Sequence, residues 1–304
     1  KKHDLVLVSR SEQKNKIYLP YTWTNSKNIK FFQYDINLDL DSIISLVTNN
    51  NIKIIVNFSA QSMVAQSWDN PEDWMRTNVL SFSKLINKLS KIDFIEKFIH
   101  ITTPEVYGNC EGLVYEDKIK DPSTPYAISR AASDMIVDSY FKFFNFPFIG
   151  TRASNVYGEG QQLYRIIPKT IIKILKKHKL DLHGGGISDR NFIYMDDVCS
   201  ATYLLMQKGN LGEYYHISGD NVIKIKDLVA KICDMMNVKF EDTVNIIDER
   251  IGKDLSYRLD NTKIKSLGWK NLVKLENGLI ETIKWVKDNY EFLKNEEENY
   301  IHKK

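Results

Sequence analysis

Two short segments of the sequence carry side chains that could together oxidise an alcohol. The first is Thr102-Thr-Pro-Glu-Val-Tyr-Gly108, which follows a strand-like apolar run, and the second is Tyr126-Ala-Ile-Ser-Arg130, at a predicted helix start. Tyr126 and Arg130 share one helix face, where the cation can hold the tyrosine as a phenol of low pKa. A hydroxyl such as that of Thr103 can share the proton. This trio suits removal of a proton from an alcohol such as a sugar hydroxyl while hydride leaves the same carbon.

The segments around these residues alternate between strand and helix patterns. An isolated tyrosine–arginine pair of this spacing is most often a solvated helix start, so the surrounding sequence must show whether this pair is functional. Strand candidates are residues 4–8, 30–35, 52–58, 96–103 and 147–153, and helix candidates are about 40–49, 71–92 and 125–144. Short apolar runs bounded by polar residues are typical of buried parallel strands. The sequence therefore predicts an α/β fold with a doubly wound, Rossmann-type parallel sheet.

Polar residues follow each strand candidate directly. Open parallel sheets bind ligands beyond the carboxyl ends of their strands. The residues at these places are 9–10, 35, 59–62, 102–105 and 152–157. Because polar residues follow every strand candidate in this way, we interpret the tyrosine–arginine pair as part of a candidate active site.

The pattern changes after residue 158. A predicted helix at 165–178 precedes three consecutive glycines and a predicted strand at 190–195. Later elements are a strand at 213–217 and helices at 225–236 and 274–292, and the charged residues 290–304 are expected to form a solvated tail. We expect two units, one of residues 1–158 with 187–220 and one of residues 159–186 with 221–304.

The composition narrows the classes of function. Among 304 residues, 42 basic and 39 acidic side chains leave a net charge of +3, which provides no basic field for nucleic acid. No stretch approaches the ~18 consecutive apolar residues of a transmembrane helix. The three cysteines, Cys110, Cys199 and Cys233, are too dispersed for a disulfide framework or a zinc site. We expect a reducing, cytoplasmic setting and no bound metal.

The ordered set of motifs resembles the extended short-chain dehydrogenases/reductases, and within them the nucleotide-sugar 4,6-dehydratases of the dTDP-glucose and GDP-mannose type. The matching segments span essentially the whole chain: Asn57-Phe-Ser-Ala-Gln-Ser62, Thr103-Pro-Glu-Val-Tyr-Gly108, Pro122-Ser-Thr-Pro-Tyr126, Arg152-Ala-Ser-Asn-Val-Tyr-Gly158, Gly185-Gly-Ile-Ser-Asp-Arg190, Asp196-Asp197, Arg250-Ile-Gly-Lys-Asp254, Tyr257, Asp260 and Leu267-Gly-Trp269. The set is far more specific than any single motif. It implies an enzyme that oxidises a nucleotide sugar at carbon 4, eliminates water across carbons 5 and 6, and returns hydride to give a 4-keto-6-deoxy sugar, with a role in polysaccharide biosynthesis.

The resemblance also assigns roles within the candidate site. Tyr126 would be the base for the oxidation, helped by Thr103, and Glu105 would remove the carbon-5 proton. Pro104 departs from the family pattern, because dTDP-glucose dehydratases carry there an aspartate that protonates the leaving hydroxyl, although GDP-mannose dehydratases carry serine. Arg130 replaces the usual lysine; with Tyr126 it would contact the cofactor ribose, but its fork is bulkier and differently aimed.

The resemblance implies a nicotinamide cofactor, NADP or NAD. Ser59 and Ala60 would contact it, and Asp35 resembles the acid that contacts the adenine. NAD-binding folds usually have an acid for the ribose where this chain has Arg10, and an arginine there favours NADP through its 2′-phosphate. Family members open with a strand and a GxxGxxG turn that hold the pyrophosphate. Because the sequence lacks this turn, we expect the chain to be a fragment of a longer protein.

Four residues are candidates for binding the nucleotide diphosphate of the substrate: Asn155, Arg190, Arg250 and Tyr257. Arg190 resembles the arginine that clamps this group, because a bidentate guanidinium fits a diphosphate. Three other functions stay open: a nucleotide-sugar 4-epimerase, a nucleotide-glucuronate decarboxylase, which also uses a Thr-x-Glu loop, and a non-catalytic relative that only binds nucleotide sugars or a partner.

The helices at 71–92 and 125–144 correspond to the pair that forms a four-helix interface in this family. Their apolar residues exceed what one face of a sheet needs; examples are Met135, Ile136, Tyr140 and Phe141. We therefore expect a homodimer.

Overall fold

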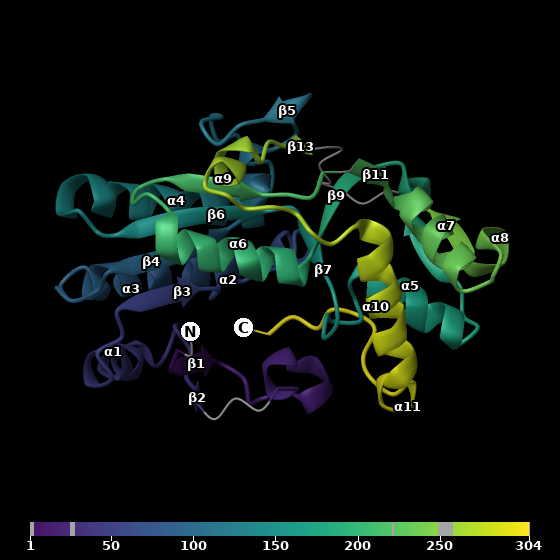
Figure 1. Ribbon diagram of the computed structural model, residues 1–304, viewed down its shortest axis with the longest axis horizontal. Helices are drawn as coiled ribbons and strands as arrows, with labels where there is room; N and C mark the ends of the chain where they lie inside the picture. The colour runs from purple at the N-terminus through teal and green to yellow at the C-terminus, as the bar shows by residue number, and fades with distance from the viewer. Residues whose placement is uncertain (1–2, 25–27, 221, 249–257, 304) are drawn as a thin grey trace.

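The structure is a computed structural model that describes residues 3–24, 28–220, 222–248 and 258–303. Its central sheet has four parallel strands in the order β10 (Tyr214–Ile217), β6 (Phe148–Ala153), β4 (Lys97–Thr102) and β3 (Ile54–Asn57). A separate parallel pair consists of β1 (Leu5–Ser9) and β2 (Ile29–Gln33). Parallel neighbours require crossover connections, and helices supply them here (Figure 1).

The helices of the first half agree closely with the sequence pattern. Helix α1 (Leu40–Asn49) lies between β2 and β3, and α4 (Pro125–Phe144) lies between β4 and β6, both with the predicted bounds. The predicted helix at 71–92 consists of α2 (Pro71–Met75), a π-helical segment η4 (Arg76–Ser81) and α3 (Phe82–Leu89). The predicted α/β fold is confirmed. None of the helices in the described ranges is long and apolar enough to cross a membrane.

Two hydrophobic cores cover the two faces of the central sheet, because consecutive side chains of a strand point to opposite faces. Phe98 and Phe148 pack on one face with residues of α3 and α4. Their sequence neighbours Ile99 and Ile149 pack on the other face with residues of α6 (Met195–Lys208). Both faces are thus buried, and the carboxyl ends of β3, β4 and β6 lie at one edge.

The C-terminal part of the chain packs at one end of the central sheet (Figure 1). Its helices are α5 (Ile166–Leu175), α7 (Ile225–Met235), α8 (Phe240–Thr243), α10 (Leu275–Asp288) and α11 (Tyr290–Leu293). Its strands are the parallel pair β8 (Leu180–His183) and β12 (Val244–Ile247), and the group β7 (Asn155–Tyr157), β9 (Asp189–Tyr194) and β11 (Val222–Lys224). The short pair β5 (Leu113–Val114) and β13 (Arg258–Leu259) and the helix α9 (Thr262–Ser266) complete the described elements. The division into two domains stays a prediction.

The C-terminal segment is not the solvated tail that its charge predicts. Glu298 forms an ion pair with Lys173 of α5 at 2.9 Å. The imidazole of His302 lies 2.8 Å from the buried Asp73 carboxylate and stacks on Trp74 with ring centroids 5.0 Å apart. The prediction of a solvated tail is wrong, because these charged and aromatic side chains find partners on α2 and α5.

Candidate active site

Thr103 and Glu105 form a hydrogen-bonded pair at the end of β4. Thr103 is the N-cap residue of the short helix η5 (Pro104–Tyr107): its hydroxyl oxygen accepts from the Glu105 N–H at 3.4 Å, and its O–H donates to Glu105 Oε2 at 2.6 Å. Pro104 takes the first position of η5, where its fixed φ favours a helix start and its missing N–H is not needed. The residue that departs from the family pattern therefore shapes the turn that orients Glu105.

Tyr126 meets this pair from the first turn of α4. The helix starts here because the side chain of Thr124 caps it, accepting from the Ala127 N–H at 3.1 Å. The N–H of Tyr126 donates to Ser67 Oγ at 3.1 Å, and its phenol lies near the side chain of Thr103. The structure thus brings the predicted Thr103, Glu105 and Tyr126 together.

The electrostatics of Tyr126 differ from the sequence-based expectation. Burial, and then the nearby Glu105 carboxylate, raise the pKa of Tyr126 from the ordinary 10.0 to about 12. Arg130 and Thr103 act in the opposite direction but do not compensate. The guanidinium of Arg130 is buried and donates to the carbonyl oxygen of Ile101, near the end of β4, so it binds the backbone of this strand as well as lying near Tyr126. The expectation that the phenol of Tyr126 has a low pKa is therefore wrong for the protein chain alone.

The loop after β3, which contains the predicted Ser59 and Ala60, is held by a residue that sequence reasoning missed. The side chain of the buried Asn78 accepts from the Gln61 N–H at 2.8 Å and donates to the Gln61 carbonyl at 3.0 Å and to Ser129 Oγ of α4 at 2.8 Å. Asn78 lies in the π-helical segment η4, a distortion that is common at functional sites. The available signal was a poor helix former inside the predicted helix at 71–92.

Backbone strain marks the same loop. Met63 has a φ of 81°, a left-handed conformation that is unfavourable for a residue with a long side chain. Such residues persist where the surrounding structure enforces them, which is most often at functional sites.

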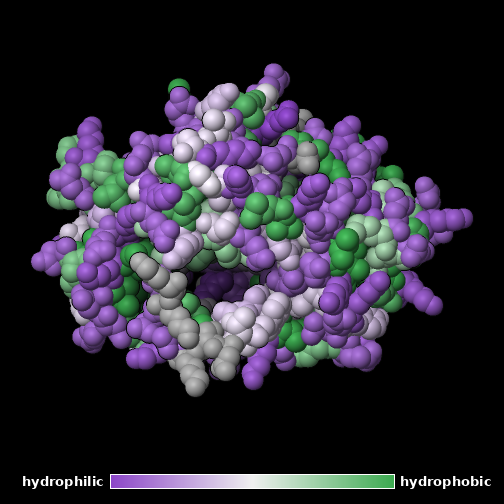
Figure 2. Space-filling model, in the orientation of Figure 1, coloured by the Kyte–Doolittle hydropathy of each residue, from purple (hydrophilic) through white to green (hydrophobic). Residues whose placement is uncertain are grey.

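Arg10, after β1, shares a contact with Gln61, which follows the predicted Ser59 and Ala60 in the loop after β3. Arg10 Nη1 and Gln61 Nε2 donate to the same carbonyl oxygen, that of Lys303, at 3.2 and 2.6 Å. Ser59 donates to the side-chain oxygen of Asn57. Figure 2 shows that this side of the molecule is hollowed near its centre. The ends of β1 and β3 and the C-terminal segment therefore meet at one place.

Asp35, at the end of β2, has a local structural role. Its Oδ1 accepts from the Asn37 N–H at 2.7 Å, and its own N–H donates to Asp39 Oδ2 at 2.8 Å. This turn leads into α1. A contact of Asp35 with adenine stays a prediction.

Buried polar atoms at the strand ends show where a polar ligand fits. Asn57 Nδ2, Thr102 Oγ1 and Ser154 Oγ are buried and have no hydrogen-bond partner among the residues that the structure describes. They lie at the ends of β3 and β4 and directly after β6. Because buried polar atoms are normally hydrogen-bonded, this edge fits a ligand rich in polar groups, such as a dinucleotide. No group of three or more His, Cys, Asp or Glu side chains in the described ranges is arranged for a metal ion.

Two of the four predicted substrate residues can be placed. Asn155 lies in β7 and Arg190 in β9, the adjacent strand, and both side chains are half-buried. Arg190 Nη1 donates to the carbonyl of Asp189 at 2.7 Å. Arg250 and Tyr257 lie outside the described residues. Binding of a diphosphate by these residues stays a prediction.

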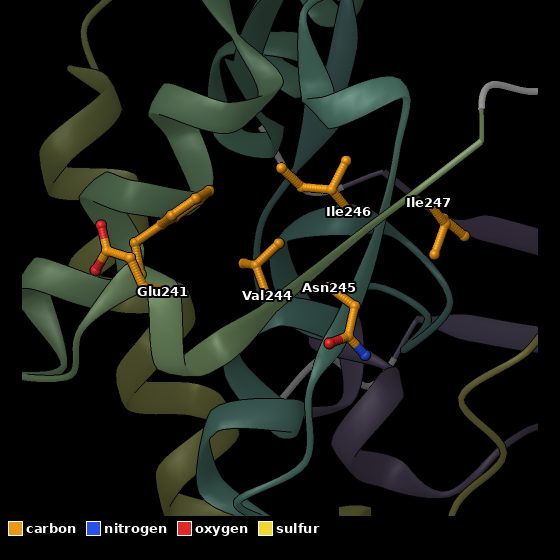
Figure 3. A pocket seen from close by; sticks show the side chains of 6 residues that line it. Glu241, Val244, Asn245, Ile246 and Ile247 are labelled. Atoms are coloured by element: carbon orange, nitrogen blue, oxygen red, sulfur yellow. The ribbon is translucent and has the colours of Figure 1, made fainter.

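A cavity of about 660 Å³ lies elsewhere, at α8 and β12 (Figure 3). Its lining residues are Phe240, Glu241, Val244, Asn245, Ile246 and Ile247. None of the candidate active-site residues lines it, so it is not the site described above.

Comparisons with known proteins agree with this geometry. The family described as GDP-mannose 4,6 dehydratase matches residues 1–282. The dTDP-D-glucose 4,6-dehydratase of Bos taurus is 33% identical over 282 residues, which are 91% of this chain and 79% of the relative. The crystal structure of dTDP-glucose 4,6-dehydratase from Streptomyces venezuelae with NAD bound superposes with a TM-score of 0.87 at 27% identity, covering 94% of this chain and 88% of that one. A mutant UDP-glucuronic acid 4-epimerase from Bacillus cereus, also with NAD, has a TM-score of 0.80 at 25% identity, covering 87% and 83%.

The raised pKa of Tyr126 gives a spectroscopic prediction. The difference in tyrosinate absorbance between the protein and its Tyr126→Phe variant should show no ionisation at pH ~10, where an ordinary tyrosine is half ionised. Glu105→Gln should move this ionisation to lower pH, because it removes a negative charge that favours the neutral phenol. Half ionisation of Tyr126 below pH ~10 in the unaltered protein would contradict the geometry described here.

Proposed function

The chain belongs to the GDP-mannose 4,6 dehydratase family, and from that premise we propose that it is a nucleotide-sugar 4,6-dehydratase. Its reaction is oxidation at carbon 4, loss of water across carbons 5 and 6, and return of hydride to carbon 6. The observation that supports this choice is the Glu105 carboxylate, which lies within hydrogen-bonding distance of Thr103 beside Tyr126. A 4-epimerase needs one base, whereas elimination needs a second one, and Glu105 supplies it.

In the first step Tyr126 accepts the proton of the carbon-4 hydroxyl. When bound, an oxidised nicotinamide would supply the hydride acceptor and a positive charge that would make the phenol of Tyr126 easier to ionise. Thr103 lies between Tyr126 and Glu105 and can hold the reacting hydroxyl through a hydrogen bond. The carbon-4 alcohol becomes a ketone, and the hydrogen at carbon 5 becomes acidic.

In the second step the carboxylate of Glu105 removes the carbon-5 proton. The electron pair forms a double bond between carbons 5 and 6, and hydroxide leaves carbon 6. Pro104 offers no acid, so the leaving group takes its proton from Glu105 or from solvent. After hydride is returned to carbon 6, carbon 5 regains a proton and the 4-keto-6-deoxy sugar is complete.

A 4-epimerase is the second candidate, because a solved UDP-glucuronic acid 4-epimerase is among the structural neighbours. Nucleotide-glucuronate decarboxylation and binding without catalysis also stay open. Mass spectrometry of a panel of nucleotide sugars separates them: loss of water supports the dehydratase, loss of carbon dioxide the decarboxylase, and an unchanged mass the epimerase or the binding protein.

Glu105→Gln should separate the two steps, because it keeps the shape of the side chain and removes its basicity. With substrate added to the full-length protein, the absorbance of reduced nicotinamide should rise and stay high, and no water should be lost. Unaltered protein should show only a transient rise, and Tyr126→Phe should show neither signal. Glu111→Gln, the same change at an exposed residue nearby, should behave as the unaltered protein. Dehydration by Glu105→Gln at the unaltered rate would contradict the scheme.

We propose NAD as the cofactor. The expected preference for NADP has no support from the two solved relatives described above, which contain NAD. Isothermal titration of the full-length protein should give tighter binding of NAD than of NADP. Tighter binding of NADP, lost in Arg10→Asp, would overturn this choice and make Arg10 the reader of the 2′-phosphate.

We also propose a homodimer formed through α4 and the helical segment η4 packed against it. Ile136, Tyr140 and Phe141 do not argue for it, because they pack against the core of their own chain. Ile128 and Met135 do, because they are 46% and 63% exposed and seven residues apart on one helix face.

Sedimentation velocity tests the dimer at micromolar concentration. The unaltered protein should sediment as a dimer and Met135→Glu as a monomer, because a charge would have to be buried in an apolar interface. Ile280→Glu, a matched change at an exposed residue of α10, should stay dimeric. A monomeric unaltered protein would contradict the proposal.

A further inference from the structure

A cluster of four buried polar side chains shares the elements η5 and α4 with the candidate site but includes none of its residues. The cluster consists of Asp134 from α4, Arg152 from β6, Tyr107 from η5 and His216 from β10, and each side chain is at most 1% exposed. Four elements that are far apart in the sequence therefore meet at one set of hydrogen bonds.

The centre of the cluster is the guanidinium of Arg152. Its Nη2 donates to Asp134 Oδ2 at 2.7 Å, and its Nη1 donates to the hydroxyl of Tyr107. The guanidinium lies between two aromatic rings, 4.8 Å from the centroid of Tyr107 and 4.1 Å from that of Tyr214. The planar fork is thus fixed by two hydrogen bonds and two ring faces, which a lysine could not satisfy.

The donor directions in the cluster are determined. His216 Nδ1 lies 3.1 Å from the carbonyl oxygen of Asp260, which can only accept, so Nδ1 carries the proton. His216 Nε2, at 2.8 Å from the Tyr107 hydroxyl, then accepts from it. Burial and the charge of Arg152 lower the pKa of His216 to about 3, in agreement with a neutral imidazole. Tyr107 therefore accepts from Arg152 and donates to His216 at 2.8 Å, and the carbonyl oxygen of Glu116, at 3.4 Å, is a second and more distant acceptor for the same hydroxyl.

Each end of this series of hydrogen bonds lies on an element that carries a candidate active-site residue. Tyr107 is two residues from Glu105 in the same short helix. Asp134 is eight residues from Tyr126 in α4, on the same helix face because of the spacing of four and four. We propose that Arg152 and Tyr107 are positioning residues, which hold the η5 turn against α4 so that Glu105 faces the carbon-5 proton while Tyr126 holds carbon 4.

This inference rests on the proposed function, and it predicts an unequal effect on the two steps. Tyr107→Phe keeps the aromatic ring and removes the hydroxyl that joins η5 to Arg152 and His216. The turn that carries Glu105 should loosen while α4, still held by Asp134 and Arg152, keeps its place. The first-turnover rate of cofactor reduction should change little, whereas the rate of water loss should fall by about ten- to a hundredfold with KM nearly unchanged. Reduced cofactor should accumulate.

The matched control is Tyr214→Phe. Tyr214, in β10, is the other tyrosine whose ring lies beside Arg152. Its hydroxyl donates to Oδ1 of Asp138, a residue of α4, at 2.8 Å, and it has no hydrogen bond to η5 among the described residues. Its removal should lower stability but leave the ratio of the two rates unchanged. Arg152→Lys keeps a positive charge for Asp134 but has no second arm to reach Tyr107, so it should show the same pattern as Tyr107→Phe, and it serves as the test if Tyr107→Phe does not fold. Equal losses in both steps, or the same pattern in Tyr214→Phe, would overturn the proposal.

Hydrogen exchange gives a readout that does not need activity. The amide of Gly108 donates to the Glu105 carbonyl at 3.1 Å, and that of Asp121 donates to the Val106 carbonyl at 2.9 Å. Tyr107→Phe should speed exchange of these amides and leave that of residues 127–137 unchanged, and Tyr214→Phe should not affect them. If the protein dehydrates no sugar but this pattern is found, the proposed function fails and the positioning holds. Unchanged exchange at Gly108 would overturn the positioning.

Discussion

The ion pair between Asp134 and Arg152 is the interaction on which the arrangement of this protein depends most. Both side chains are almost completely removed from water, at 0% and 1% exposure, so neither charge is tolerable without the other. Burial alone would raise the pKa of Asp134, but Arg152 and His100 hold it well below its usual range. Removal of one partner from such a pair costs about 3–5 kcal/mol. The pair therefore fixes α4 against β6 in the folded protein. Because the folded-state pKa of Asp134 is depressed, its contribution is present above pH ~4 and is lost as the pH falls further.

The sheet and this ion pair together explain how Glu105 and Tyr126 come to lie at one place, as the proposed mechanism requires. Parallel strands place their carboxyl ends at one edge, so the turn that follows β4 and the helix that follows it can face each other. Glu105 and Tyr126 then differ in environment. Burial and the carboxylate of Glu105 raise the pKa of the phenol to about 12, whereas Glu105 shares a hydrogen bond with Thr103. In the proposed mechanism, this difference in environment lets the two side chains act as separate bases, one for the carbon-4 hydroxyl and one for the carbon-5 proton.

The features that were predicted correctly from the sequence are those that depend on interactions between neighbouring residues. The bounds of α4 could be predicted because Thr124 and Pro125 form a helix start that depends on neighbouring residues only. The pKa of Tyr126 was predicted in the wrong direction because burial and Glu105, which come from the fold, outweigh Arg130. The clamp made by Asn78 and the contacts of His302 also escaped prediction, since each joins residues far apart in the sequence.

Isotope transfer within the sugar tests the central claim most directly. A nucleotide sugar with deuterium at carbon 4 should be converted by the full-length protein into a product that has lost one water and carries the deuterium on carbon 6. This result requires oxidation at carbon 4, elimination of water across carbons 5 and 6, and return of the same hydride. Deuterium that is found again at carbon 4 in a product of unchanged mass would contradict the account and favour an epimerase.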